Sequence, residues 1–564
     1  MAITEQHVEV GRQLRPGQVA VEVLQANGVD IVFGLNGEHV LGLYDALAAT
    51  PAIRHVTVKH ENNAAIAAEV YGRLTGRPGV VTVTAGPGAT NSLSGVAGAM
   101  ATGSPLVHIS GGVPKGAELE SFHGVDNPNI LGRAFSGATK WSTRVTDPHQ
   151  VAEALTRAFA IAVSGRPGPV HVELARNVLD GGPISAPDVR PVPAPTAATP
   201  TGLDSLIAKI DATQQVAIVA GKGAWWPEVS AALPALAEAL GAPVLHTWDG
   251  HAAMPTAHPL SLGMFRATMS QPEALESLRQ ADLVLGVGVR PGTEAARDLP
   301  KFSGGPVVCL MAGDQPDPSR GPAIPSMASL AATVRALAGG VCRRTASNDT
   351  LEACARAKAT LHAAIQAELR RYAHARPWHI GLAIQALAER MTADHVVTSD
   401  VSTVKLWMPL QLPVFGPESH VQAGTWGEMG YALPAALGAA FARPNRKVIA
   451  LTGDASFLMS SSDFVTLCQW KLPVVLAIHH DGHIGMIYQM QVARGDAPFA
   501  TEIGQVDYAR YAEACGARGI RVEDSDDLGP AWDQALAADG PVVLDLVAGH
   551  EAPWPRLPRL LAEG

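Results

Sequence analysis

The sequence has few cysteines, no long apolar run and no apolar leader. Its five cysteines are scattered among 564 residues without a CxxC pair or a zinc-ligand spacing, which indicates free thiols in a reducing compartment. No window of about 18 residues is free of Gly, Pro and charge, so we expect no membrane span. The N-terminal segment carries acids and lacks an apolar core, so we expect no secretory signal.

Positive charge is also scarce. The chain has 42 Lys and Arg against 52 Asp and Glu, a formal net charge of −10, and no run of basic residues. Proteins that bind nucleic acids usually carry a basic face. We therefore expect neither a nucleic acid nor a membrane as a partner, and we expect a cytoplasmic location. The composition, 47% apolar and 17% charged, is typical of a globular protein with several domains.

Short runs of aliphatic residues alternate with Ala-rich stretches of helical periodicity. We interpret as strands the runs VVTVTA (80–85), VHVEL (170–174), VAIVA (216–220), LVLGVGV (283–289), HVVTSD (395–400), VIALTG (448–453) and VVLAIHH (474–480). Continuous apolar strands are typical of parallel sheets that helices cover on both faces. The sequence therefore predicts an α/β fold with three doubly wound parallel-sheet domains.

Proline-rich and helical segments predict the domain boundaries. A proline-rich run of residues is typical of a linker, and an amphipathic stretch is expected to form a connecting helix that ends before Pro377. The predicted organisation is a first domain at 1–182, a linker at 183–202, a central domain at 203–345, a connecting helix at 346–377, a last domain at 378–550 and a tail at 551–564. Whether the first and last domains share a topology is left open.

Two aspartates follow neighbouring strands of the last domain. Asp454 comes directly after the strand 448–453, and Asp481 comes directly after the strand 474–480. The carboxyl ends of parallel strands are where open α/β sheets bind ligands. Two carboxylates that lie close together repel each other unless a cation lies between them, and a hard divalent cation would also accept phosphate oxygens. The spacing therefore indicates a metal and phosphate site.

The turn after Asp454 would complete such a site. The backbone N–H groups of Ala455 and Ser456 could bind phosphate at the turn into a helix that we expect to begin near Ser460. The alternative interpretation is that Asp454 caps this helix and Asp481 belongs to a turn, since aspartate is favoured at both positions.

A glutamate lies at the start of a helix rich in small residues. Glu61 follows a β-run within VTVKHENNAAIAAE (56–69). One interpretation is an ordinary first-turn glutamate that the helix dipole favours. The other is a buried carboxyl group that holds a proton for acid–base catalysis.

These motifs, taken in order, resemble the thiamine-diphosphate-dependent enzymes of the acetohydroxyacid synthase, pyruvate oxidase and benzaldehyde lyase superfamily. The segment that contains Asp454 and Asp481 resembles the family's GDG…NN motif. KHENNAA (59–65) and its flanking segments resemble the pyrimidine-binding domain, and GTWGEMGYALPAALGAA (424–440) resembles the stretch GxGxMGxxLPAA. The resemblance is strong over 30–180 and 395–490. It implies a pyrimidine-binding, a central and a diphosphate-binding domain.

The resemblance implies thiamine diphosphate and Mg²⁺ as cofactors. Metal ligands would be Asp454, Asp481 and the main-chain carbonyl of His483. The residues implied to contact the cofactor are Glu61, Pro87, Asn91, Ser402, Thr403, Gly427, Met429, Asp454, Ala455, Ser456, Asp481, Gly485 and Met486. The chain departs from the motif, since Ala455 replaces a glycine and His480-Asp481 replaces Asn-Asn. An aspartate still offers an oxygen ligand, which Mg²⁺ prefers.

In the resembled family, a glutamate at the position of Glu61 hydrogen-bonds N1′ of the cofactor's aminopyrimidine. The carbonyl of Gly427 would accept a proton from the 4′-amino group. The backbone N–H of Met429 would bond N3′, and its side chain would lie between the two rings. Glu61 is therefore the expected catalytic residue, and this geometry would bring the reacting atoms together.

The resemblance implies a carboligase or lyase that makes or cleaves a carbon–carbon bond next to a carbonyl of a small 2-keto acid or 2-hydroxy ketone. His39 and His123 are candidates for catalytic proton transfer, and the expected substrate pocket comprises His39, His123, Met486, Gln489 and Met490. Acetohydroxyacid synthases carry Gln and Trp at the positions of His123 and Met490, which argues against an ordinary branched-chain biosynthetic role. Two alternatives stay open: an acyl-CoA lyase or decarboxylase related to oxalyl-CoA decarboxylase, with RLPRLLAEG (556–564) as a faint candidate for its basic entry, and a non-catalytic nucleotide-binding paralogue.

The central domain lacks a dinucleotide fingerprint. GKGAWW (221–226) and GVGVRPG (286–292) both break the pattern GxGxxG. Some members of the resembled family bind FAD or ADP in this domain, but CLMAGDQPDP (309–318) replaces their usual acid pair. We therefore do not predict FAD and leave ADP open. The resemblance also implies a homodimer or homotetramer with active sites at the interface.

Overall fold

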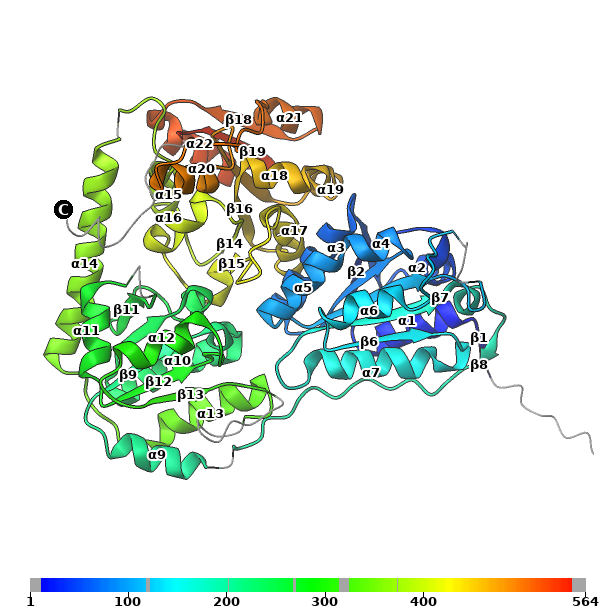
Figure 1. Ribbon diagram of the computed structural model, residues 1–564, viewed down its shortest axis with the longest axis horizontal. Helices are drawn as coiled ribbons and strands as arrows, with labels where there is room; N and C mark the ends of the chain where they lie inside the picture. Colours follow the sequence, from blue (N-terminus) through cyan, green and yellow to red (C-terminus); the bar gives the residue numbers. More distant parts are fainter. Residues whose placement is uncertain are drawn as a thin grey trace, which may run out of the picture. The chain divides into compact units, whose positions relative to one another are not determined.

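The structure is a computed structural model that describes residues 12–117, 122–200, 202–266, 270–313, 324–372 and 374–549. The chain folds into two compact units, which divide between Ala194 and Pro195, except that residues 164–166 belong to the second unit (Figure 1). Among the described helices, none is both long enough and apolar enough to cross a bilayer. The expected tail at 551–564 lies outside the described residues.

The first unit contains a six-stranded parallel sheet with the order β3-β2-β4-β5-β7-β6. Its strands are β2 (Ile31–Leu35), β3 (Arg54–Thr57), β4 (Gly79–Val83), β5 (Leu106–Gly112), β6 (Trp141–Val145) and β7 (Pro169–Ala175). Alternate residues of a strand point to opposite faces, and in β4 Val80 joins one core while its buried neighbour Val81 does not. Both faces of the sheet are therefore buried.

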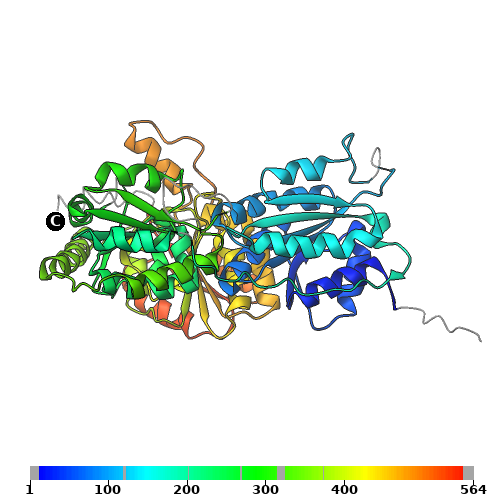
Figure 2. The same cartoon turned by 90° about the horizontal axis from the view of Figure 1, so that it is seen from below.

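Helices cover this sheet on both faces (Figure 2). The core that contains Val80 is closed by α1 (Pro16–Ala26), α2 (Leu41–Ala48) and α7 (Val151–Val163). On the other face, α3 (Glu61–Thr75) packs on β2 and β4 and against α5 (Leu93–Thr102). The small residues of α3, which include Ala64, Ala65 and Ala68, let it approach the sheet closely.

The predicted linker is largely free of regular structure, with one exception. A short strand, β8 (Ile184–Ser185), pairs antiparallel with β1 (Gln13–Leu14). The backbone N–H of Ala186 also donates to the carbonyl of Arg12 at 2.8 Å. The proline content of the segment does not predict this pairing, because the pairing depends on a partner strand that is far away in the sequence.

The last part of the second unit contains another six-stranded parallel sheet, with the order β15-β14-β16-β17-β19-β18. Its strands are β14 (His395–Ser399), β15 (His420–Gln422), β16 (Lys447–Gly453), β17 (Val474–His480), β18 (Arg518–Val522) and β19 (Val542–Val547). When the strands of each sheet are renumbered in chain order, this sheet and the sheet of the first unit both read 2-1-3-4-6-5. The first and last domains therefore share a topology.

The central part of the second unit contains a five-stranded parallel sheet with the order β11-β10-β9-β12-β13. Its strands are β9 (Val216–Ala220), β10 (Val244–His246), β11 (Ser261–Met264), β12 (Leu283–Val287) and β13 (Val307–Leu310). The strand order reverses between β9 and β12, which is the position where doubly wound sheets bind ligands. The expected α/β fold with three parallel-sheet domains is confirmed, whereas the domain boundaries stay predictions.

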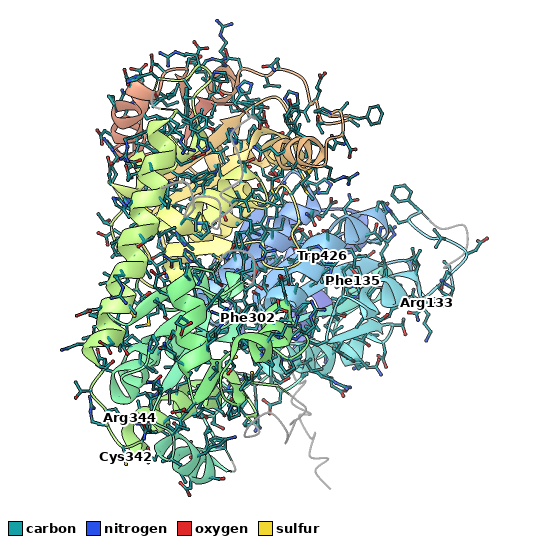
Figure 3. All side chains as sticks on the ribbon, turned by 60° about the vertical axis from the view of Figure 1, so that its left-hand side comes forward. Arg133, Phe135, Phe302, Cys342, Arg344 and Trp426 are labelled. Carbon is teal, nitrogen blue, oxygen red and sulfur yellow. The ribbon has the colours of Figure 1, made fainter. Side chains whose placement is uncertain are left out.

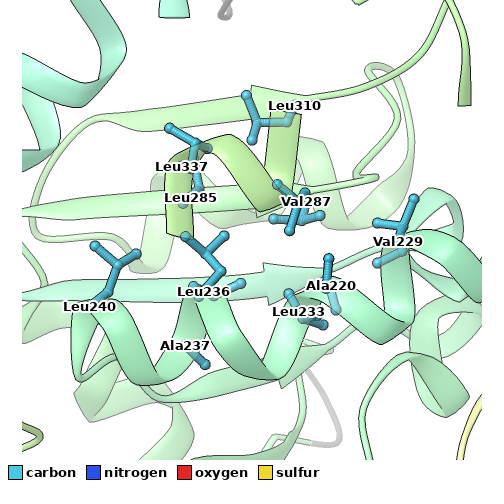
Figure 4. Close-up of a cluster of buried hydrophobic side chains, with 14 of the residues drawn as sticks. Ala220, Val229, Leu233, Leu236, Ala237, Leu240, Leu285, Val287, Leu310 and Leu337 are labelled. Atoms are coloured by element: carbon cyan, nitrogen blue, oxygen red, sulfur yellow. The ribbon is translucent and has the colours of Figure 1, made fainter. Parts of the chain in front are cut away.

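One apolar core holds the central sheet to its helices (Figure 4). Leu233, Leu236 and Leu240 of α10 (Pro227–Leu240) are buried at three- and four-residue spacing. They pack with Leu285 of β12 and with Leu337 of α13 (Met327–Gly340). Burial of each such leucine stabilises the fold by about 1.5–3 kcal/mol.

One predicted helix limit is confirmed and one is wrong. The connecting helix α14 (Asn348–Arg370) ends before Pro377, and the N–H groups of Arg371 and Tyr372 donate to carbonyls three residues earlier, which tightens its last turn. The helix expected to begin near Ser460 is α18 (Asp454–Ser460), which ends there instead. The helix begins directly after β16, because Asp454 is its first residue.

Candidate functional site

Glu61 is the first residue of α3 and lies at the carboxyl edge of the first sheet. Its side chain is buried, with 8% of its surface exposed. The Asn91 side-chain amide donates to Glu61 Oε2 at 3.0 Å. A side chain at Gly88 would contact Glu61 Oε1 at 3.4 Å. The structure therefore brings Glu61 and Asn91 together, with the helix α4 (Pro87–Asn91) beginning at Pro87 beside them.

His39 and His123 lie at the same end of this unit. Their ring centroids are 5.0 Å apart in an edge-on arrangement, and the Phe122 ring contacts both. A Cβ atom at Gly86 would lie 2.9 Å from the Cβ of His123, so only glycine fits there. Burial, reinforced by His123, lowers the pKa of His39, which makes a neutral imidazole the dominant form at neutral pH.

In the second unit, Asp454 is the first residue of α18 and is fully buried. It follows β16, and Asp481 follows the neighbouring strand β17. Burial and the nearby Asp481 carboxylate raise the pKa of Asp454 to about 6. Asp454 Oδ2 accepts hydrogen bonds from the backbone N–H groups of Asp481 at 3.1 Å and Gly482 at 2.7 Å. The two aspartates that the sequence singled out are therefore brought together.

The loop after Asp481 is compact. Gly485 begins α20 (Gly485–Ala493), and a Cβ atom there would lie 2.4 Å from Asp481 Oδ2 and 3.4 Å from Thr403 Oγ1. The ring of His483 hydrogen-bonds the carbonyl of Asp481 through Nδ1 at 2.9 Å. Gly485, Asp481 and Thr403 therefore meet at one place, which is where a metal-bound diphosphate would need room.

The residues expected to bind phosphate surround this place. Thr403 begins α16 (Thr403–Gln411) and Ser402 caps it, with the Ser402 hydroxyl buried and without a hydrogen-bond partner among the described residues. Ala455 and Ser456 form the first turn of α18. The Ala455 N–H is already bonded to Asp454 Oδ1 at 2.8 Å. Helix N-termini and free hydroxyl groups are suited to anions.

The described residues contain no cluster of three His, Cys, Asp or Glu side chains in a metal-binding arrangement. The expected ligand set has two carboxylates and one main-chain carbonyl, so it would not form such a cluster. The pKa of Asp454 is nevertheless raised by burial and by the Asp481 carboxylate. A divalent cation between the two carboxylates would lower this pKa, because it stabilises the charged form of each. Oxygen ligands of this kind suit Mg²⁺.

The segment expected to hold the cofactor rings precedes α17 (Ala432–Ala442). Gly427 has φ +68° and Gly430 has φ +80°, conformations that glycine adopts at little cost. Met429 lies between them and is partly buried. Trp426 is 51% exposed and is labelled in Figure 3. This loop therefore presents the Trp426 side chain at the surface of the second unit.

Asp400 organises this region, and the sequence analysis missed it. Its carboxylate is fully buried and accepts hydrogen bonds from the backbone N–H groups of Tyr431 at 3.2 Å and Ala432 at 3.1 Å. Asp400 follows β14 just as Asp454 follows β16 and Asp481 follows β17. The rule that identified the other two aspartates therefore also applies to this one.

The helix α20 carries the remaining residues of the expected substrate pocket. None of its residues is buried, and Met490 is 46% exposed. Met486 lines a cavity that it shares with the central domain, whereas Gln489 and Met490 lie further along the helix. The structure places these three on one helix of the second unit, while His39 and His123 belong to the first unit.

The cavity at Met486 lies at the carboxyl ends of β9, β10 and β12. It has a volume of about 310 Å³ and is lined by both domains of the second unit. Four basic side chains line it: Lys222, Arg266, Arg290 and Lys405. The guanidinium of Arg266 and the ammonium of Lys405 each lie within 6 Å of the centroid of the Trp248 ring. Three carboxylates, Asp249, Glu294 and Asp298, offset part of this charge. The cavity is suited to a ligand with an anionic group.

Three segments of the chain match known families. Residues 15–130 match the family described as "Thiamine pyrophosphate enzyme, N-terminal TPP binding domain". Residues 203–337 match "Thiamine pyrophosphate enzyme, central domain". Residues 400–546 match "Thiamine pyrophosphate enzyme, C-terminal TPP binding domain". Together these matches include β2 to β5 of the first sheet, all strands of the central sheet and β15 to β18 with most of β19 in the last sheet.

Curated relatives are similar over nearly the whole chain. The "Acetolactate synthase" of Bacillus subtilis is 30% identical over 552 residues, which cover 94% of this chain and 93% of the relative. The "Probable acetolactate synthase large subunit" of Methanocaldococcus jannaschii is 29% identical over 559 residues, with 97% and 94% covered. The "Acetolactate synthase isozyme 2 large subunit" of Escherichia coli is 29% identical over 557 residues, with 96% and 97% covered.

Proposed function

Because this chain belongs to the thiamine-pyrophosphate enzymes and is related to the acetolactate synthases over almost its whole length, we propose that it is a carboligase that joins a 2-keto acid to a second carbonyl compound. The observation that carries the proposal is the buried Asp454, which lies beside Asp481 and holds the loop after β17 by two backbone hydrogen bonds. A non-catalytic binding protein would not need this arrangement together with a buried Glu61.

The second unit would hold the diphosphate end of the cofactor. Asp454, Asp481 and the main-chain carbonyl of His483 would bind Mg²⁺, since all three are oxygen ligands. The buried hydroxyl of Ser402 supports a phosphate contact, because it lacks a partner among the described residues and a buried polar group needs one. The other groups proposed to contact the diphosphate are Thr403, Ala455, Ser456, Gly485 and Met486.

The first unit would hold the aminopyrimidine end. Glu61 would share a proton with the ring nitrogen N1′, and its burial keeps water from competing for that proton. Asn91 orients the Glu61 carboxyl group by its hydrogen bond to Oε2. Pro87 would pack on the ring from the start of α4. Gly427 and Met429 of the second unit would bond the 4′-amino group and N3′.

The bound cofactor supplies a carbon nucleophile for the substrate carbonyl and an acceptor for the electron pair that remains when the neighbouring bond breaks. His39 and His123 are the proposed groups for proton transfer to the substrate. The lowered pKa of His39 favours a neutral ring that can accept a proton. Met486, Gln489 and Met490 are proposed to shape the pocket for the substrate side chain.

We propose a homodimer or homotetramer with the active site at the subunit interface. Glu61 and Asp454 belong to different units, and both are required by the proposed site. Large apolar side chains of α18 and of the Met429 loop are exposed: Leu458 by 39% and Met459 by 60% in α18, and Trp426 by 51% in the loop. Such groups on a soluble enzyme are typical of a surface that another subunit covers. This surface adjoins the Met429 loop, since a Cβ atom at Gly430 would contact Met459 at 3.1 Å.

A second ligand in the central domain is also proposed. The cavity lined by Lys222, Arg266 and Lys405 suits the phosphates of a nucleotide such as ADP. FAD is not part of the proposal. A calorimetric titration of the protein with ADP checks this site, and no heat of binding at millimolar ADP would contradict it.

Product analysis tests the proposed reaction. The full chain is incubated with thiamine diphosphate, Mg²⁺ and one of three compounds: pyruvate, benzoylformate or benzoin. We expect carbon dioxide and a 2-hydroxy ketone product from a 2-keto acid, in a reaction that requires both cofactors. Cleavage of benzoin without release of carbon dioxide would favour a lyase. Cofactor binding without turnover of any compound would contradict the carboligase and favour a non-catalytic protein.

A further inference from the structure

A chain of polar side chains lies next to Asp481 and joins β17 to its neighbour β19. His480 is the last residue of β17, and its Nδ1 donates to Asp545 Oδ1 at 2.8 Å. Its Nε2 forms a hydrogen bond with Gln505 Oε1 at 3.2 Å. Arg521 Nη1 donates to the other oxygen of Asp545 at 2.8 Å. Four side chains from separate segments therefore form one connected path.

The register of three strands sets this path. Asp545 of β19 pairs with Ile478 of β17 and with Arg521 of β18. Residues two apart in a strand point to the same face, so His480 points to the same face as Ile478 and Asp545. A slip of one residue in either pairing would turn one member to the opposite face. The path therefore depends on the sheet rather than on a flexible loop.

Asp545 is buried and charged, so it needs its partners. None of its surface is exposed, whereas 34% of the Arg521 side chain is exposed. A buried carboxylate that loses a hydrogen-bond donor is strongly destabilised. Arg521 and His480 satisfy both oxygens, which fixes the orientation of the His480 ring. The Tyr508 ring contacts His480 edge-on, with 5.0 Å between the ring centroids.

At its other end the path reaches the proposed metal-binding segment. A Cβ atom at Gly482 would lie 2.6 Å from Gln505 Nε2, so the amide packs directly on this glycine, which has φ +72°. The Ile503 N–H donates to the carbonyl of Gly482 at 3.1 Å. The Ile484 N–H donates to the carbonyl of Thr501 at 2.7 Å. The segment from 481 to 484 is therefore held by Asp454 on one side and by residues 501–505 on the other.

We propose that His480, Asp545 and Gln505 are positioning residues that fix the segment 481–483 for the divalent cation, an inference that rests on the proposed function. The Asp481 carboxylate and the main-chain carbonyl of His483 must both face the cation. Side chains that fix the backbone between these two residues also set the distance between the two ligand oxygens. Partners behind metal ligands contribute in this way, and their loss weakens metal binding by about 10–100-fold.

Two variants and a matched control test the positioning chain. Gln505→Ala removes an exposed side chain and its contacts with His480 and Gly482. Asp545→Asn keeps the volume and removes the charge. Glu523→Gln is the control, because Glu523 also accepts from Arg521, at 2.8 Å, but lies outside the path to the metal segment. Mg²⁺ binding is measured by calorimetry with thiamine diphosphate in excess, and the melting temperature is measured without cofactors.

We expect Gln505→Ala and Asp545→Asn to weaken Mg²⁺ binding by about tenfold or more. The melting temperature of the cofactor-free Gln505→Ala variant should stay near that of the parent, and Glu523→Gln should match the parent in both measurements. Parental Mg²⁺ affinity in Gln505→Ala would overturn the positioning role, whether or not the Asp545 variant folds. If the parent itself binds no Mg²⁺ with thiamine diphosphate, the proposed function fails instead, and the inference fails with it.

Discussion

The hydroxyl of Thr452 donates a hydrogen bond to Asp400 Oδ2 at 3.0 Å, so a buried carboxylate joins the ends of β14 and β16. The same carboxylate accepts from the backbone N–H groups of Tyr431 and Ala432. Burial raises the pKa of Asp400, whereas these donors act in the opposite direction. One side chain therefore connects the loop that contains Met429 with the strand that leads to Asp454.

Asp400→Asn should lower both stability and cofactor affinity. In the variant, the side-chain NH₂ of asparagine would replace one of the two carboxylate oxygens that accept backbone hydrogen bonds. The backbone N–H at that position would lose its acceptor, and an unsatisfied buried donor costs about 1–3 kcal/mol. The Met429 loop would lose its attachment, so thiamine diphosphate should bind more weakly. Thermal unfolding and a fluorescence titration with the cofactor measure the two effects. Thr452→Val removes only one donor and should have the smaller effect; parental values for Asp400→Asn would contradict the role.

Glu61→Gln should bind the cofactor and lose most activity. Glutamine has nearly the same size and can still accept from Asn91, so the fold should be retained. It cannot exchange a proton with a ring nitrogen, and general acid–base groups contribute about 10²–10⁴-fold to a rate. Initial rates and a cofactor titration on the same preparation separate the two properties. Glu153→Gln, on the exposed face of α7, is the control, and full activity of Glu61→Gln would exclude a catalytic role.

Asp454→Ala should abolish Mg²⁺-dependent binding of thiamine diphosphate. The variant loses a proposed metal ligand and also releases the N–H groups of Asp481 and Gly482. Calorimetry with and without Mg²⁺ should therefore detect no metal-dependent binding. Asp496→Ala, which removes a partly exposed acid after α20, should bind like the parent. Equal affinity of Asp454→Ala and the parent would mean that the metal site lies elsewhere.

Acid should destabilise the second unit through its buried histidines. The rings of His251 and His420 stack with centroids 4.7 Å apart, and both ring nitrogens of His420 lack a hydrogen-bond partner among the described residues. Burial and His246 lower the pKa of His420 to about 3. Burial and its two histidine neighbours also lower the pKa of His251 well below the usual 6.5.

The sign of this effect follows from proton uptake. Above pH 6.5 these histidines are neutral in both states, and their contribution to stability is fully present. As the pH falls below 6.5, the unfolded chain takes up protons that the folded chain does not, and stability falls by about 1.4 kcal/mol per pH unit for each histidine. His420→Phe should therefore make the decrease in melting temperature between pH 7 and pH 5 shallower. The exposed His362→Gln should leave it unchanged, and an unchanged slope in His420→Phe would contradict the assignment.

The strands and the carboxylate pair could be predicted because their signals are local. The strands VAIVA (216–220) and VVLAIHH (474–480) have the predicted limits, since runs of β-branched residues between turn residues favour a strand over a helix. Asp454 and Asp481 could be predicted because residues after adjacent parallel strands meet at one edge. The resemblance supplied the cofactor, which composition and spacing alone did not.

The remaining features depend on contacts between distant segments. The pairing of β1 with β8, the contact of Asp545 with His480 and the packing of Gln505 on Gly482 join residues that no periodicity connects. Helix limits were also less predictable, because the end of α14 depends on the geometry of its last turn. The roles of the individual site residues, from Glu61 to Met490, stay predictions until the variants are measured.

The repeated strand order of the first and last domains has a consequence for how the protein can evolve. Two copies of one architecture, each with its own apolar interior, need not change together. Substitutions that reshape the surroundings of His39 leave the interior below Asp454 intact. If the first domain holds the aminopyrimidine end of the cofactor and the last domain its diphosphate end, as proposed, the surroundings of His39 can diversify for new substrates while the diphosphate site is preserved.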